Sequence, residues 1–155
     1  MSLTNNFTNI DPYVKTVELT GGVLAFTPAS ITSTGAVTSS SPSAGVGYAA
    51  GAGGAVTQAT NKSTGVTLNT ATGAITMNNA SLAGATTVSF TLTNSVIAVT
   101  DVIDVSVKSG SVTGLYTANV SATGAGSCQI SVTNFGSTAS EVVVINFVVI
   151  KGANS

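Results

Sequence analysis

The chain has 155 residues, the length of one ordinary domain, which is enough to bury a single hydrophobic core without disulfide or metal staples. Only 6% of its residues are charged, against roughly 25% in an average globular domain, so its surface has to be built from Ser, Thr, Asn and Gly. A formal net charge of −1 with no basic cluster excludes a protein that binds nucleic acid through phosphate neutralisation.

Residues 1–44 differ in composition from the rest of the chain. One strand is predicted over Val14–Leu19, and residues 27–44 consist almost entirely of Ser, Thr, Ala, Pro and Gly. Side chains this small and polar cannot drive a core of their own. The first residues also lack the basic and apolar regions of a secretory signal, so we expect synthesis and use in the cytosol. The sequence predicts an N-terminal arm and Ser/Thr-rich linker over residues 1–44, followed by a β-sandwich domain over residues 45–155.

Glycines are concentrated between residues 45 and 54. Closely spaced glycines can let main-chain amides approach a phosphate, but no Gly-Lys-Ser/Thr follows, and Ala55–Thr57 has the composition of a strand. We therefore favour close main-chain approach, either between strands or at an axis where copies of the chain meet. The residues expected at such a self-contact are Tyr48, Gly51, Gly53 and Gly54.

Alternation of apolar and polar residues recurs along the rest of the chain with turn residues between the runs, which is typical of sandwiches and barrels. In the clearest run, residues 87–94, Val88, Phe90 and Leu92 point to one side and hydroxyl residues to the other. Further strands are predicted over Thr64–Leu68, Ala74–Met77, Val102–Val107, Leu115–Ala122, Cys128–Asn134 and Glu141–Lys151. The sequence therefore predicts an all-β fold, an antiparallel β-sandwich of the jelly-roll or immunoglobulin-like kind with an extended N-terminal arm.

Two connections have recognisable patterns. Residues 69–73 separate two predicted strands, and Gly73 could supply the positive φ that closes a short hairpin. Residues 77–84 could form a short helical or 3₁₀ turn, because Asn78 or Asn79 could cap it and Gly84 could end it. We predict a hairpin at the first connection and a helical connector at the second.

Residues 142–150 form an apolar run that only Asn146 interrupts. The run is about half of the ~18 residues that a membrane-spanning helix needs, so it predicts a strand and no membrane segment. Because the run does not alternate, both of its faces must be covered. The alternatives are a central position in the fold and a contact with another copy of the chain.

Few residues of the chain could take part in catalysis. It contains no His, one Cys and five carboxylates, so we predict that it is not an enzyme and has no cofactor. Cys128 is interpreted as a small buried apolar residue. Asp101 and Asp104 are close in sequence, but on one strand their spacing would send them to opposite faces. No metal site is predicted, although ion binding by this pair stays open.

The part of the chain from Gly47 to Gly152 resembles a group of small phage virion structural proteins and domains. Besides Gly47 and Tyr48, the similar strings are residues 51–60, 62–69, 72–80, 88–94, 126–128 and 146–152. The resemblance implies a virion component, with related modules found both alone and at the ends of longer chains. A short arm before an uncharged β-domain is similar to a capsid decoration or cement protein.

A protein of this kind would lie on the outer capsid surface, be assembled in the host cytoplasm, bind the major capsid protein and stabilise the shell. The resemblance also implies self-association, expected as a homotrimer, with neither nucleic acid nor membrane as a partner. Capsid anchoring would fall to the arm, at residues Leu3, Phe7, Ile10, Tyr13, Val17 and Leu19. The alternative is a tail-fibre or receptor-binding head domain that recognises a host surface ligand.

Overall fold

The computed structural model describes residues 35–43 and 45–153, so the strand predicted over Val14–Leu19 lies outside the described residues. The chain divides into two units, Met1–Gly45 and Val46–Ser155. Of the predicted arm and linker, only residues 35–43 are described, and they contain neither strand nor helix. The described part of the chain has no helix that could cross a membrane.

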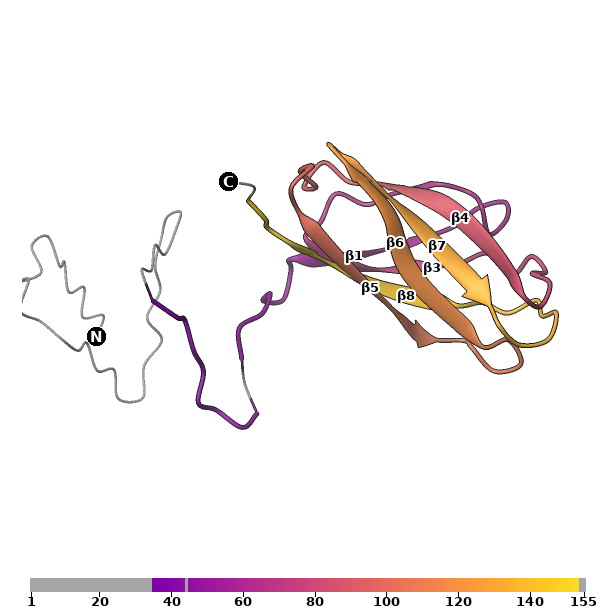
Figure 1. The fold of residues 1–155 in the computed structure, drawn as a ribbon, viewed down its shortest axis with the longest axis horizontal. Helices are drawn as coiled ribbons and strands as arrows, with labels where there is room; N and C mark the ends of the chain where they lie inside the picture. The colour runs from indigo at the N-terminus through magenta and orange to yellow at the C-terminus, as the bar shows by residue number, and fades with distance from the viewer. Residues whose placement is uncertain (1–34, 44, 154–155) are drawn as a thin grey trace, which may run out of the picture. The chain divides into compact units, whose positions relative to one another are not determined.

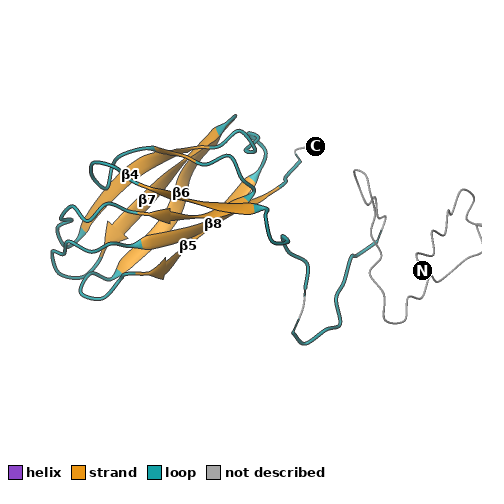
Figure 2. Ribbon diagram, turned by 180° about the vertical axis from the view of Figure 1, so that it is seen from behind, coloured by secondary structure: helices purple, strands orange, loops and turns teal. Residues whose placement is uncertain are grey.

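The second unit contains eight strands that form two sheets. The strands are β1 (Gly53–Thr57), β2 (Val66–Thr67), β3 (Thr72–Thr76), β4 (Thr86–Thr93), β5 (Val102–Ser109), β6 (Tyr116–Gly124), β7 (Ser127–Asn134) and β8 (Val144–Ile150). One four-stranded sheet has the order β1-β3-β8-β5 and the other has the order β2-β4-β7-β6 (Figure 1, Figure 2). The two sheets pack face to face, which confirms the predicted all-β class and the two-layer arrangement.

Both sheets are mixed, so the prediction of a purely antiparallel sandwich is wrong. β1 runs parallel to β3, and β2 runs parallel to β4, whereas the remaining pairs are antiparallel. The reason is that the chain changes sheet at each of its first three connections. After two such crossings it returns to its starting sheet in the same direction, which makes the neighbouring strands parallel.

The hydrophobic core lies between the sheets. Alternation in β4 buries Phe90 and Leu92, which are 2% and 0% exposed, and leaves Thr91 in solvent. On the facing sheet, the inner residues of β8 are Ile145, Phe147 and Val149, all buried. β8 lies between β3 and β5, so the central position considered for this apolar run is confirmed.

The hairpin predicted around Gly73 is wrong. β2 and β3 lie in different sheets, and Gly73 is inside β3 and not among the glycines with positive φ. A Cβ at this position would lie 2.8 Å from Leu68 Cδ2 and 2.9 Å from Phe147 Cε1. Glycine is therefore required here for close packing against Leu68 and against Phe147 of the neighbouring strand, and not for a turn.

The helical connector predicted over residues 77–84 is also wrong. The segment is irregular and contains one isolated bridge, between Leu82 and Ala139. The Asn78 side chain accepts a 2.9 Å hydrogen bond from the N–H of Ala80, the local bond by which Asn competes with helix formation.

Candidate interaction surfaces

The predicted self-contact residues lie in β1 and in the segment that leads into it. Tyr48 is half-exposed, and its hydroxyl donates a 2.5 Å hydrogen bond to the carbonyl oxygen of Val149 in β8. This bond ties the segment before β1 to the central strand of the same sheet. Gly51 has a φ of 93°, a conformation that glycine adopts without strain.

The other two predicted contact residues begin edge strand β1. A Cβ on Gly54 would lie 2.8 Å from Leu68 Cδ1, so this glycine permits close approach within the fold. Gly53 is exposed, and a Cβ there would meet Thr72 at an ordinary 3.4 Å. Only Gly53 of this pair therefore presents its main chain to the surface.

An apolar groove of about 500 Å³ lies where Tyr48 meets β8, and we call it the β8 groove. Its lining residues are Val46, Gly47, Tyr48, Val148, Ile150 and Lys151. Val46 and Ile150 are 82% and 53% exposed. Val102 of β5, the register partner of Ile150, is 60% exposed and extends the apolar surface. Contiguous exposed apolar side chains of this kind are typical of contact surfaces.

The outer face of the other sheet is built from hydroxyl and amide side chains. Alternation directs residues such as Phe90 and Ile130 into the core and leaves their neighbours outside. The outward residues are Thr87, Ser89, Thr91 and Thr93 on β4, Gln129, Ser131 and Thr133 on β7, and Thr117, Asn119 and Ser121 on β6. Of these, Ser131 is itself buried, with 8% of its surface exposed. We call this surface the hydroxyl face, and none of these ten side chains carries a charge.

Hydrogen bonds between strands hold these side chains in place. The pairs are Thr87 with Thr133 (2.8 Å), Ser89 with Ser131 (2.8 Å), Ser131 with Ser121 (3.1 Å) and Ser121 with Gln129 (3.0 Å). A register shift in β6 between Val120 and Ala122 leaves Ser121 without a register partner, within hydrogen-bonding distance of β7. The hydroxyl face is therefore an ordered array and not a set of independent surface side chains.

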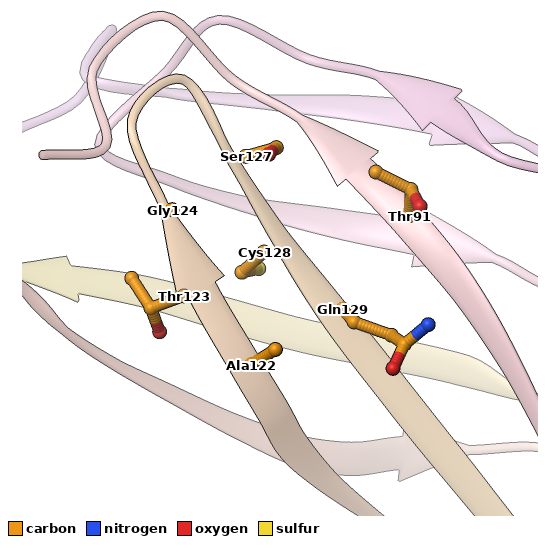
Figure 3. Close-up of a pocket in the computed structure, with 7 residues that line it drawn as sticks. All are labelled: Thr91, Ala122, Thr123, Gly124, Ser127, Cys128 and Gln129. Carbon is orange, nitrogen blue, oxygen red and sulfur yellow. The ribbon is translucent and has the colours of Figure 1, made fainter. Parts of the chain in front are cut away.

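A shallow hollow of about 280 Å³ opens near the β6–β7 turn, at one end of this face (Figure 3). It is lined by Thr91 from β4, by Ala122, Thr123 and Gly124 from β6, and by Ser127, Cys128 and Gln129 from β7. Cys128 is only 2% exposed, as predicted for a buried apolar residue, and burial raises the pKa of its thiol to about 11. The polar side chains that line the hollow carry hydroxyl and amide groups, and Ala122 and Gly124 add apolar lining.

An exposed aromatic ring follows the other end of β7. Phe135 is 66% exposed and Leu115 is 63% exposed. The N–H of Phe135 donates a 2.9 Å hydrogen bond to the carbonyl oxygen of Leu115. Phe135 directly follows Asn134, the last residue of β7, and Leu115 directly precedes Tyr116, the first residue of β6. An apolar pair thus borders the hydroxyl face opposite the hollow.

Asp101 and Asp104 do not form a common site. Asp101 is buried, and its carboxylate accepts hydrogen bonds from the N–H of Ala98 at 2.8 Å and from Lys151 Nζ at 2.6 Å. These two groups hold the pKa of Asp101 below its ordinary value. Asp104 is exposed on β5. Across residues 35–43 and 45–153, no group of three or more His, Cys, Asp or Glu side chains could hold a metal ion.

Lys62 is a buried charge that sequence reasoning missed, because lysine is ordinarily exposed. It is 3% exposed, and its ammonium group donates hydrogen bonds to the main-chain oxygens of Asn78 at 2.7 Å and Glu141 at 2.6 Å. The Tyr116 ring centroid is 5.9 Å away. Desolvation lowers the pKa of Lys62. The contacts identify Lys62 as a structural tie between loops.

Glu141 serves a second loop. Its carboxylate accepts hydrogen bonds from three consecutive N–H groups, those of Val112, Thr113 and Gly114, at 3.1, 2.5 and 3.0 Å. The hydrogen bond from Thr113 is the main cause that lowers the pKa of Glu141. The carboxylate thereby fixes the loop between β5 and β6.

The six residues predicted to anchor the chain to a capsid, Leu3, Phe7, Ile10, Tyr13, Val17 and Leu19, lie outside the described residues. Comparisons with models of protein families, with curated proteins and with solved structures found no match to the chain.

Proposed function

We propose that the chain is a structural virion protein, a capsid decoration protein that binds the outer shell and associates with further copies of itself. The observation that carries the proposal is the β8 groove. It presents Val46, Ile150 and the neighbouring Val102 to solvent on a chain with very little charge. A contact between copies would remove this apolar surface from water at about 25 cal/mol per Å².

Two further properties support a role in a lattice. The division after Gly45 suits a protein with separate anchoring and body parts. A net charge of −1 allows many copies to pack closely with little mutual repulsion. On a lattice, a modest contact made by each copy gives strong retention because later contacts form at high effective concentration.

We further propose that the sandwich is immunoglobulin-like. In support, β7 lies between β4 and β6, as strand E lies between strands B and D in an immunoglobulin domain. Likewise, β5 pairs with β8, as strand C pairs with strand F. β3 then takes the position beside β8 that strand G occupies in an immunoglobulin domain.

The experiment is the copy number of this chain in purified virions, measured by quantitative mass spectrometry against the major capsid protein. A ratio near one, or near one third, is expected for a decoration protein. Absence from the particle, or a ratio lower by orders of magnitude, would overturn the assignment. Deleting residues 1–34 should abolish capsid attachment and leave the β-domain folded.

Self-association is tested separately by sedimentation of the purified chain. Val102→Ser beside the β8 groove should shift the equilibrium toward monomer. The matched control is Val112→Ser, which makes the same change at an 83% exposed valine in the loop at the opposite end of β5. If the two variants sediment with the same monomer fraction, the β8 groove is not the surface through which the copies associate.

A further inference from the structure

The hydroxyl face has a regular geometry that suits an extended ligand. Neighbouring strands lie about 4.8 Å apart, and alternate residues along a strand repeat at roughly 6.7 Å. The outward side chains of β4, β7 and β6 therefore form a two-dimensional grid. Because the bonds from Thr87 to Thr133 and from Ser89 to Ser131 already fix rotamers, a ligand would immobilise few additional side chains on binding.

The grid keeps unused hydrogen-bonding capacity. A Ser or Thr hydroxyl can donate one hydrogen bond and accept two, so a bonded pair such as Thr87 and Thr133 still offers one donor hydrogen and acceptor lone pairs. Asn119 and Gln129 are exposed and add amide groups. Such a surface matches a ligand that carries closely spaced hydroxyls of its own.

The two ends of the face add complementary features. At one end, Phe135 exposes an aromatic ring beside Leu115, a platform for the apolar C–H face of a pyranose ring. At the other end, Thr91 and Gln129 line the hollow. Aromatic surface combined with a few placed polar groups is the usual composition of a small-molecule site.

We propose that the hydroxyl face, from Phe135 to the hollow, binds a neutral polysaccharide lying along β7. The absence of charge on this face favours a neutral polymer over an anionic one. Recognition of sulfate or carboxylate groups calls for Arg or Lys, and neither occurs among the ten outward residues. The proposal is independent of capsid decoration, which rests on the β8 groove in the other sheet.

The test is affinity electrophoresis of the full chain through gels that contain dextran, laminarin, galactomannan or galactan. Heparin and alginate serve as anionic comparisons. We expect retardation by at least one neutral polymer and none by the anionic ones. Retardation only by anionic polymers, or no retardation by any neutral polymer of the panel, would overturn the proposal.

Two variants assign any binding to this face. Thr133→Val deletes one hydroxyl and keeps the shape of the side chain, so affinity should fall about three- to tenfold, the effect of one hydrogen bond. Phe135→Ala removes the platform and should weaken binding by roughly tenfold. Thr57→Val, the same change on the exposed outer side of β1, is the matched control and should bind like the parent chain.

Thermal unfolding checks that each variant is folded. If Phe135→Ala does not fold, the binding of Thr133→Val alone decides whether the polysaccharide contacts this face. Retardation that both variants leave unchanged would place the polysaccharide elsewhere and overturn the proposal. Loss of self-association in Thr133→Val, measured by sedimentation, would assign the face to a second copy of the chain instead.

Discussion

The ammonium group of Lys62 donates a 2.6 Å hydrogen bond to the main-chain oxygen of Glu141, 79 positions further along the chain. A second bond of 2.7 Å reaches the oxygen of Asn78, so one side chain joins three connecting segments of the sandwich. Burial of a charge is costly unless it is hydrogen-bonded, and these two bonds, with the nearby Tyr116 ring, meet that condition.

Lys62→Met should lower the free energy of unfolding by about 2–3 kcal/mol, because it leaves the Asn78 and Glu141 oxygens without their charged donor. Urea unfolding followed by circular dichroism measures the change. Lys108→Met, at an exposed lysine on β5, is the control and should stay within about 0.5 kcal/mol of the parent. Equal midpoints for the two variants would show that Lys62 does not stabilise the fold.

Stability should decline in acid because the pKa values of Glu141 and Asp101 are lowered in the folded chain. A carboxylate whose pKa is lowered in the folded chain stabilises the fold at a pH above its unfolded-state pKa, which is about 4 for both groups. This stabilisation is lost as the pH falls through the folded-state pKa. Unfolding measured between pH 7 and pH 2 should therefore show a falling free energy at the acid end. Glu141→Gln and Asp101→Asn should each show a shallower decline, and a slope as steep as that of the parent would refute the assignment.

Gly73→Ala should destabilise the chain by about 1–3 kcal/mol, the usual cost of overpacking a close contact. The added methyl group would press on Leu68 and Phe147 at under 3 Å. Gly124→Ala is the control, since its nearest neighbour would be Ser127 Oγ at 3.9 Å. Thermal unfolding compares the two, and a melting temperature for Gly73→Ala no lower than that of the control would contradict the packing explanation.

Cys128 should resist thiol reagents at pH 8 in the native chain, because it is 2% exposed and its pKa is raised to about 11. In concentrated urea it should react fully. Thr117→Cys adds a thiol at an exposed position of β6 and should react rapidly without denaturant. Rapid labelling of Cys128 in the native parent chain would mean that the end of the sandwich near the β6–β7 turn opens easily.

Sequence reasoning located strands well where alternation is regular. The run over residues 87–94 corresponds to β4 at Thr86–Thr93, and the run that begins at Val102 corresponds to β5. Alternation also separates the hydroxyl residues of β4 from its core residues. It could not show that Ser89 meets Ser131, because the two residues are 42 positions apart and nothing local constrains that pairing.

The amino-acid sequence by itself determined the all-β fold class, because alternating apolar and polar residues suit strands that bury one face whatever their partners are. Only the tertiary structure decided which strands pair, why Gly73 has to be glycine and that Lys62 is buried. Main-chain hydrogen bonds are alike for every residue and carry no information about partners. Pairing, packing and the burial of a charge therefore depend on which apolar faces meet in the complete fold.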